Sequence, residues 1–352
     1  MRDELAERLL AAVMSWTPGD VARERPRLQA LAAFKYDEYQ QFSPGLRFVE
    51  SFARWLGQFT PAERPTAYEF VLDRLVFVSS EEMSHLVSMV FADVVQPYLF
   101  RRVAVERGTE PWRVADLATS QAYRVRKRQT LFLGLSDGAR LDTFRRATPT
   151  LSNEQVYQTY EIPDQRVDSL RRELRRDLDR IDAEEEVDQF RTVVLLDDFG
   201  GTGDTYGGKI RRVVKSLRDP QSAMYGLTTP DAEMIAVVYL ATERARTKLR
   251  DVAAELAEFP IRIEVVHIFP DSIRLEPMKE PFSAIVDRYL DWEQDEHFAK
   301  GGSTDAKYGY GGCGLPVVLT HNTPNDSLFL LWTSKAQLTG LFPRIDRHKE
   351  IA

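Results

Sequence analysis

The sequence predicts an α/β protein: a parallel sheet with helices on both faces, preceded by an all-α N-terminal domain. The prediction depends on a change of pattern near residue 129. Before it, apolar residues recur every three or four positions, as in amphipathic helices; after it, short apolar runs alternate with helical segments, as in βαβ units. The chain of 352 residues, 43% of them hydrophobic, is long enough for two cores. We therefore expect a helical accessory domain at 1–125 and an α/β domain at 126–352.

The N-terminal domain is expected to be a set of amphipathic helices. The helical pattern covers residues 4–16, 45–59, 61–78 and 79–100. Thr60 before Pro61, and Ser79 before an acidic first turn, are typical of helix N-termini. Residues 1–110 carry 13 basic and 16 acidic side chains, so their charge does not favour a DNA-binding helix-turn-helix. This domain is expected to serve in packing or in binding a partner.

The second domain is expected to consist of buried parallel strands joined by helices. Strands are predicted at 130–135, 192–198, 233–241 and 261–269, and helices at 164–187, 207–219 and 243–259. Two further strands are predicted at 315–321 and 326–332, on either side of an Asn-Thr-Pro-Asn turn. The helix at 164–187 is almost wholly charged, which indicates a solvated face.

Residues 192–209, TVVLLDDFGGTGDTYGGK, contain the strongest candidate for a site. Asp197 and Asp198 lie at the carboxyl end of a buried-strand pattern, where open α/β sheets bind ligands. The glycine-rich loop after them runs into a helix start, and the N–H groups of such a loop favour a bound phosphate. Thr202 and Thr205 add hydroxyl donors. An anion site beside two carboxylates follows from these residues alone.

Several interpretations of this loop compete. Gly203 to Lys209 fits GxxxxGK, but Ile210 stands where a P-loop needs Ser or Thr, and the glycines begin too late after the strand. A dinucleotide-binding GxGxxG fails at Tyr206. A tight acidic turn that binds nothing is a further alternative.

Another interpretation uses the acid pair. The stretch VVLLDDFGGTGDT resembles the signature of type I phosphoribosyltransferases, in which two acids after a hydrophobic strand precede a Thr-Gly-x-Thr loop. The resemblance implies binding of 5-phosphoribosyl-1-pyrophosphate or a nucleotide, with Asp197 and Asp198 as the catalytic pair on the ribose hydroxyls. It also implies Mg²⁺, which these two carboxylates would contact indirectly, through ribose or water. The implied phosphate-binding residues are Gly200, Gly201, Thr202, Gly203, Asp204 and Thr205. Gly201 departs from the family pattern, where a threonine is common.

Two more stretches extend the resemblance over roughly residues 125–335. In LFLGLSDGARLDTFRRA, the loop of Ser136, Asp137 and Gly138, with Arg140 after it, lies where the family contacts pyrophosphate. Together with KYGYGGCGLPVVLTHNTPNDSLFLLW, this stretch is similar to phosphoribosyltransferase-like proteins of bacterial conflict and anti-phage systems, including those encoded beside retron reverse transcriptases. In some of these relatives the N-terminal accessory domain is winged-helix-like.

The C-terminal stretch carries further candidates with two interpretations each. His321, Asn322 and Asn325 form either a turn after a strand or part of a hood over the acceptor site. The glycines of 309–314, with Tyr308 and Tyr310, form either a turn or a mobile, ligand-closing loop. The basic stretch Arg124, Arg126, Lys127 and Arg128 is either a solvated linker or a nucleic-acid contact.

The resemblance implies a glycosyltransferase of the phosphoribosyltransferase type that transfers or cleaves at ribose C1, acting as an anti-phage effector. The alternatives are a non-enzymatic sensor of the donor or of a nucleotide, and a toxin held inactive by a partner. Implied partners are a complex of reverse transcriptase and nucleic acid, another defence protein, or a second copy in a homo-oligomer. The net charge of −7 and the lack of an apolar run of 18 residues favour a cytoplasmic protein with no membrane contact.

Overall fold

The computed structural model describes residues 3–183, 186–289, 306–333 and 338–344. The chain divides into two compact units, one formed by Met1–Glu82 with Pro270–Ala352 and the other by Met83–Phe269. This division differs from the boundary expected after residue 125. The helices of 83–125 group with the sheet, and the segment after 269 groups with the N-terminal helices. Pairing between segments so distant in the chain leaves no periodic pattern in the sequence, which is why local analysis did not find it.

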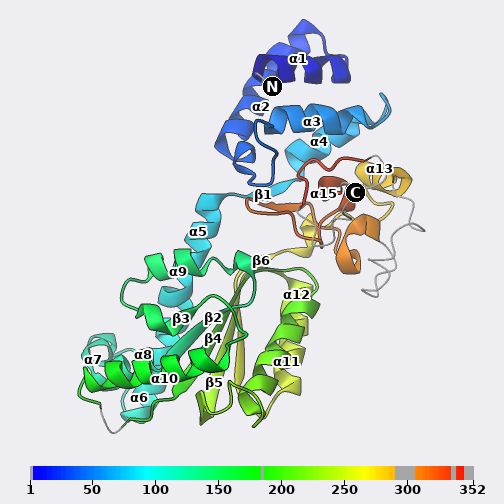
Figure 1. The fold of residues 1–352 in the computed structure, drawn as a ribbon. Helices are drawn as coiled ribbons and strands as arrows, with labels where there is room; N and C mark the ends of the chain where they lie inside the picture. The colour runs from blue at the N-terminus through cyan, green and yellow to red at the C-terminus, as the bar shows by residue number, and fades with distance from the viewer. Residues whose placement is uncertain (1–2, 184–185, 290–305, 334–337, 345–352) are drawn as a thin grey trace. The chain divides into compact units, whose positions relative to one another are not determined.

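The unit of residues 83–269 is built on a five-stranded parallel sheet in the order β3-β2-β4-β5-β6 (Figure 1). The strands are β2 (Thr130–Gly134), β3 (Val156–Tyr157), β4 (Phe190–Gly200), β5 (Thr228–Thr242) and β6 (Ile261–Phe269). Four of the strands predicted for this part of the chain are confirmed as β2, β4, β5 and β6. From β2 the chain first adds β3 on one side and then crosses to β4 on the other, so the order reverses between β2 and β4.

Helices cover both faces of this sheet. Before β2 come α5 (Ser80–Met89), a π-helical segment (Val90–Val95), α6 (Gln96–Glu106), α7 (Val114–Thr119) and α8 (Gln121–Arg128). Between strands lie α9 (Leu141–Ala147), α10 (Asp164–Asp179), α11 (Asp204–Arg218) and α12 (Glu243–Glu255). Buried side chains of α10, α11 and α12 share a cluster with Leu131 and Val193. On the opposite face, Phe132 contacts Phe91 and Phe144, with ring centroids 6.4 and 5.0 Å apart. The predicted α/β class is confirmed.

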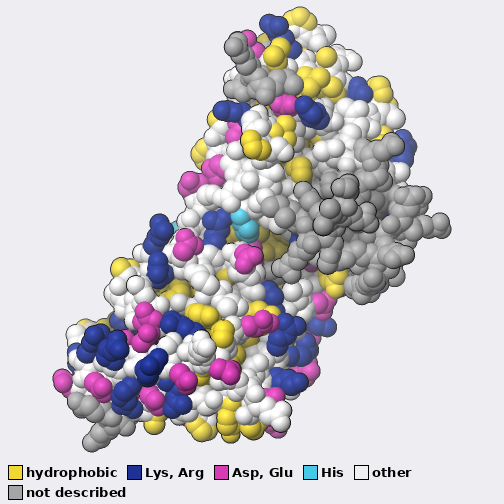
Figure 2. All heavy atoms as spheres, in the orientation of Figure 1, with side chains coloured by type: hydrophobic (Ala, Val, Ile, Leu, Met, Phe, Trp, Pro, Cys, Tyr) yellow, Lys and Arg dark blue, Asp and Glu magenta, His cyan; other side chains and the backbone are white. Residues whose placement is uncertain are grey.

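The charged helix α10 has the solvated face expected for it. Its buried residues are spaced three or four apart: Val167, Leu170, Leu174 and Leu178. Arg172 and Arg176 are exposed on the other side, and Figure 2 shows basic and acidic side chains intermixed over this part of the surface. The helix ends at Asp179, earlier than the predicted residue 187.

The other unit joins both ends of the chain in one core. Its elements are α1 (Asp3–Met14), α2 (Pro18–Phe34), α3 (Phe48–Gly57), α4 (Arg64–Asp73), β1 (Val76–Val78), α13 (Pro281–Tyr289), β7 (Val317–Leu319) and α15 (Phe329–Trp332). β1 pairs in parallel with β7, Phe77 opposite Val318. The Trp55 indole N–H donates to the Leu330 carbonyl at 2.8 Å, and the Ser51 hydroxyl donates to the Leu341 carbonyl at 2.7 Å.

Two predictions for this unit were wrong. The helix predicted through residue 78 ends at Asp73, and Val76–Val78 forms a strand, because these residues find a partner in β7. The strand predicted at 326–332 is instead the single helical turn α15, whose side chains are all buried. A short apolar run that is buried on every side has no periodicity to distinguish strand from helix.

No helix among the described residues has the length and apolarity to cross a membrane. The sequence analysis left helix α2 unassigned. By contrast, the helix start at Ser79 is confirmed. The Ser79 hydroxyl accepts the Glu82 N–H at 3.1 Å, and the Glu82 carboxylate accepts the Ser79 N–H at 2.8 Å, a reciprocal capping box.

Candidate functional site

The candidate site lies at the carboxyl ends of β2 and β4, where the strand order reverses. In open parallel sheets, the two connections that leave such a point run in opposite directions and leave a crevice that ligands occupy. β2 ends at Gly134, paired with Leu196 of β4. The loop that starts with Ser136 leaves from β2, and the acid pair with its glycine loop leaves from β4. The fold thus brings together two residues that lie 61 positions apart in the sequence, as the Ser136–Asp197 hydrogen bond shows.

Asp197 is held from both sides of its carboxylate. The side chain is buried, with 4% of the residue exposed. Its Oδ1 accepts two hydrogen bonds, one from the Ser136 hydroxyl and one from the Asp198 N–H at 3.2 Å. The other oxygen lies 3.4 Å from the Lys209 ammonium. Asp197 is therefore a fixed part of the site.

Asp198 is less buried and has different partners. Its Oδ1 accepts the Phe199 N–H at 2.9 Å and lies 3.4 Å from the Ser136 hydroxyl. Its Oδ2 lies against the α-carbon of Gly138, so close that a β-carbon there would collide with the carboxylate. The Ser136–Gly138 loop thus rests on both acids, and glycine is the residue that permits this approach.

Lys209 is a site residue that the sequence analysis missed. It lies in the second turn of α11 and its side chain, 18% exposed, points to Asp197. Two adjacent carboxylates at the end of a buried strand need a nearby positive charge, and Lys209 is the first basic residue after them in the chain. This position in the sequence could have identified Lys209 as the partner of the acid pair.

The surroundings raise the pKa of Asp197 from 3.8 to about 7. Burial is the main cause and the negative charge of Asp198 is the second, while Lys209 and the Ser136 hydrogen bond oppose the rise. A carboxyl with this pKa exchanges its proton near neutral pH, a property that is common among functional groups.

This raised pKa predicts a pH-dependent stability. Between pH 3.8 and about 7 the folded chain holds a proton on Asp197 that the unfolded chain has released. The contribution to the free energy of unfolding is therefore complete below pH 3.8 and is lost as the pH rises through 7. Urea unfolding followed by circular dichroism should show a shallower decline over this range for Asp197→Asn, which stays neutral. Parallel pH profiles for the two proteins would contradict the assignment.

Asp137, Ala139 and Arg140 make up the rest of the β2 loop. Asp137 is exposed. The Ala139 carbonyl accepts the Tyr239 hydroxyl at 2.5 Å, which ties the loop to β5. Arg140 has a left-handed backbone, φ 47° and ψ 46°, at the start of α9. A non-glycine residue in this region carries strain, which is frequent in ligand-binding loops.

The glycine loop after β4 has a defined shape. Gly203 has φ 81°, and a β-carbon on it would lie 3.0 Å from the Ala245 carbonyl, so both its conformation and its packing require glycine. The Thr242 hydroxyl donates to the Gly201 carbonyl at 2.6 Å, and the Thr202 hydroxyl accepts the Asp204 N–H at 3.3 Å.

This loop ends at the N-terminus of α11, which begins at Asp204. The N–H groups of Thr205 and Tyr206 belong to the first turn, where a helix provides no acceptor for them. Together with the helix dipole they form a suitable place for a phosphate. Asp204 itself is exposed and lies 3.6 Å from the Lys248 ammonium, so its charge is partly offset. The loop residues predicted to bind phosphate thus lie together at one helix start.

The residues present fit a divalent cation held from outside. Within the described part of the chain, no three His, Cys, Asp or Glu side chains gather to hold a metal. Two carboxylates are too few to bind Mg²⁺ by themselves, but they are the ligand type it prefers, and the ion usually keeps several waters or phosphate oxygens. The arrangement is therefore consistent with the indirect contact expected from the sequence.

The predicted hood residues lie in the other unit. His321 and Asn322 follow β7: the His321 carbonyl accepts the Gln41 side chain at 2.7 Å, and the Asn322 side chain accepts the Thr323 N–H at 3.0 Å. The Asn325 carbonyl accepts the Tyr310 N–H at 2.7 Å. These contacts are those of a turn. Their role in a hood over the acceptor site stays a prediction.

The glycines of 309–314 form a packed connection. Tyr308 is buried, and its carbonyl accepts the Gly314 N–H at 2.6 Å. Gly309 lies against the backbone of Asp326 and Ser327. Cys313, in the same segment, is buried.

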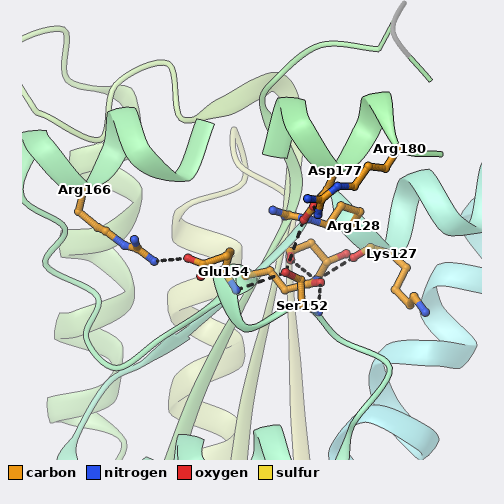
Figure 3. Close-up of polar contacts among 9 residues, drawn as sticks. Lys127, Arg128, Ser152, Glu154, Arg166, Asp177 and Arg180 are labelled. Atoms are coloured by element: carbon orange, nitrogen blue, oxygen red, sulfur yellow. Dashed lines mark hydrogen bonds and ion pairs between the residues drawn. The ribbon is translucent and has the colours of Figure 1, made fainter. Parts of the chain in front are cut away.

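The basic stretch before β2 is not a solvated linker. It forms α8, in which Arg126 and Arg128 are buried. The Arg126 guanidinium lies 2.8 Å from Glu106, and that of Arg128 lies 2.7 Å from Asp177. Figure 3 shows Arg128 and Arg180 converging on Asp177. Two of its four cations are thus neutralised inside the fold, which leaves Arg124 and Lys127 for a nucleic-acid contact, and that contact stays a prediction.

Comparison with known proteins gives one family. Searches of curated proteins and of solved structures find no match. The PRTase-CE family model matches residues 52–344, which include the sheet, the acid pair, the glycine loop and the C-terminal segment. This match covers most of the chain and both units. The chain therefore belongs to the PRTase-CE family and is a phosphoribosyltransferase-like protein.

Proposed function

We propose that the crevice between β2 and β4 binds a ribose 5-phosphate group, as part of 5-phosphoribosyl-1-pyrophosphate or a nucleotide, and transfers or cleaves at ribose C1. The observation that supports this most is the position of the acid pair. Asp197 and Asp198 lie between a loop from β2 and a glycine loop that opens a helix. Carboxylates accept hydrogen bonds from sugar hydroxyls, and helix N-termini bind phosphate, so one ligand with both groups satisfies the site.

In this proposal the residues act by position and charge. The Asp198 carboxylate accepts from the ribose hydroxyls, and Asp197 supports it from within the fold. Negative charge beside the ribose stabilises the oxocarbenium character that C1 gains as its bond to pyrophosphate breaks. The loop of Thr202–Thr205 holds the 5′-phosphate, and the Ser136–Arg140 loop faces the pyrophosphate. Mg²⁺ bound to the ligand would neutralise the departing diphosphate. The orientation of the bound ligand relative to its acceptor supplies the rest of the rate enhancement.

The test is release of pyrophosphate from labelled 5-phosphoribosyl-1-pyrophosphate in the presence of Mg²⁺ and candidate bases or nucleotides. Transfer, or cleavage to ribose 5-phosphate, would support the enzyme. Tight binding of the donor without turnover of any acceptor would contradict an enzymatic function and would favour a non-enzymatic sensor. The sensor has one observation in its favour: Ser136 and Lys209 already engage the acid pair, so a ligand that displaced Ser136 would switch the loop between two states.

We also propose that this chemistry serves as the effector of an anti-phage system, on the resemblance carried by SDGARLD, DDFGGTG and the C-terminal stretch. The expected result is growth arrest of bacteria that express the protein without its partner. Arrest that persisted unchanged in Asp197→Ala plus Asp198→Ala would contradict an effector activity at this site.

Replacing Gly138 by alanine should weaken ligand binding with little effect on the fold. The new β-carbon would force the Asp198 carboxylate out of its position, because the two would occupy the same space. Displacing a ligand-binding group by about 1 Å commonly costs tenfold or more in affinity or rate. Calorimetry with 5-phosphoribosyl-1-pyrophosphate should show this loss. Gly208→Ala is the control, since nothing lies within 4 Å of its β-carbon; equal affinities for the two variants would show that the Gly138 contact is unimportant.

A further inference from the structure

Lys209 has an environment that the proposed ligand chemistry does not by itself explain. It is one of several basic residues on α11, but the exposed fraction of its side chain is only 18%. Lys215, on the same helix, is exposed and forms no ion pair with another described residue. Burying an ammonium costs free energy unless a partner compensates for it. The compensating partner of Lys209 is Asp197, 3.4 Å away.

Among the residues that the structure describes, Asp197 forms an ion pair with Lys209 and with no other cation. Burial and the charge of Asp198 both disfavour its ionised form, and Lys209 is the positive group that opposes them. Among the described residues there is no cluster that would hold a permanent metal ion here. Elsewhere in proteins, adjacent carboxylates are commonly neutralised by a divalent cation. Here one side chain of the chain itself provides positive charge on the inner side of the acid pair.

The two acids therefore have unequal surroundings. Asp197 contacts Lys209, Ser136 and the Asp198 N–H, so both its oxygens are engaged. Asp198 is more exposed and lies under Gly138, on the side of the loop that would face a ligand. This difference separates an inner, anchored carboxylate from an outer one.

We propose that Lys209 is a positioning residue that takes the place of a metal ion at Asp197, so that the neighbouring Asp198 binds ribose hydroxyls without a divalent cation. The inference rests on the proposed function and specifies its ligand class. Sugar phosphates without a diphosphate, such as ribose 5-phosphate, bind equally with and without Mg²⁺. Only ligands that carry a diphosphate need the ion, because the ion belongs to the diphosphate.

The test is calorimetric binding of ribose 5-phosphate, in EDTA and in Mg²⁺, to the unaltered protein, Lys209→Met, Lys209→Arg and Lys215→Met. The unaltered protein and Lys215→Met should bind with affinities that Mg²⁺ changes less than about twofold. Lys209→Met should lose about tenfold in EDTA, the effect of one charge pair, and regain part of it in Mg²⁺. Lys209→Arg, which keeps the charge, should retain most of the affinity. Loss of folding alone would not produce a Mg²⁺-dependent recovery.

A double-mutant cycle with Asp197→Asn provides the second readout. If Lys209 acts through Asp197, the two substitutions should be non-additive: Lys209→Met should cost less in the Asp197→Asn background than alone, both in affinity and in urea unfolding without ligand, because the ammonium has lost its charged partner there. Additive effects of the two substitutions, or unchanged binding in Lys209→Met, would overturn this inference and leave the proposed function intact. Failure of the unaltered protein to bind any ribose phosphate, with or without Mg²⁺, would overturn the proposed function and this inference with it.

Discussion

Asp198→Asn should lower the affinity for 5-phosphoribosyl-1-pyrophosphate about 100-fold, because two charge-assisted hydrogen bonds to ribose hydroxyls become neutral ones. The fold should remain. The asparagine oxygen can still accept the Phe199 N–H that Asp198 now accepts at 2.9 Å, and removal of one of two adjacent charges relieves their repulsion. Calorimetry in Mg²⁺ measures the effect, and thermal unfolding verifies the fold.

The control for this variant is Asp251→Asn. Asp251 is an exposed residue of α12, so the substitution removes the same charge at a position away from the acid pair. Its affinity should equal that of the unaltered protein. If Asp198→Asn bound within twofold of this control, the outer carboxylate would have no part in ligand binding, and the ribose would have to be bound elsewhere.

Gly309→Ala should destabilise the unit formed by the two chain ends by about 3 kcal/mol or more. Gly309 has φ 78° and ψ 175°, a region that is essentially restricted to glycine. A β-carbon there would also lie 2.5 Å from the Asp326 carbonyl carbon and 2.6 Å from the Ser327 oxygen. Both neighbours are backbone atoms, which cannot move as a side chain can.

The matched control is Gly312→Ala in the same segment. Gly312 also has a positive φ, 65°, but nothing lies within 4 Å of its β-carbon. Its cost should be limited to backbone strain, about 1 kcal/mol. Urea unfolding followed by the fluorescence of the buried Trp55 and Trp332 measures both variants. Equal costs would indicate that the segment is a loose loop able to adapt, as the mobile-loop interpretation of the sequence expects.

Short apolar runs in the sequence made the strands of the sheet predictable. β6 begins and ends at the predicted residues 261 and 269, and the acid pair lies at the carboxyl end of β4, as its buried-strand pattern indicated. The contact between Ser136 and Asp197 was not predicted; it arises because the carboxyl ends of neighbouring parallel strands lie at one edge of the sheet. The roles of these residues in binding stay predictions.

Other features depend on contacts that no local pattern records. Whether 326–332 forms a strand or a helical turn is decided by what surrounds it, and the partner of Val76–Val78 is a strand near the other end of the chain. The sequence analysis considered Lys209 only as part of a GxxxxGK match, because its position relative to Asp197 depends on how α11 packs beside β4. Arg126 and Arg128 were expected in a solvated linker or a nucleic-acid contact, because their burial likewise depends on how α8 packs.

The discontinuous unit has a consequence for the order in which the protein folds during synthesis. Residues 83–269 form a complete compact unit as soon as they leave the ribosome, whereas residues 3–82 lack the C-terminal half of their core. At bacterial or eukaryotic rates of translation the intervening segment takes roughly 10–40 s to make. During that time the apolar faces of α1–α4 can pack only against one another, without the side chains that the C-terminal segment contributes to their core. This core is therefore completed only at the end of synthesis.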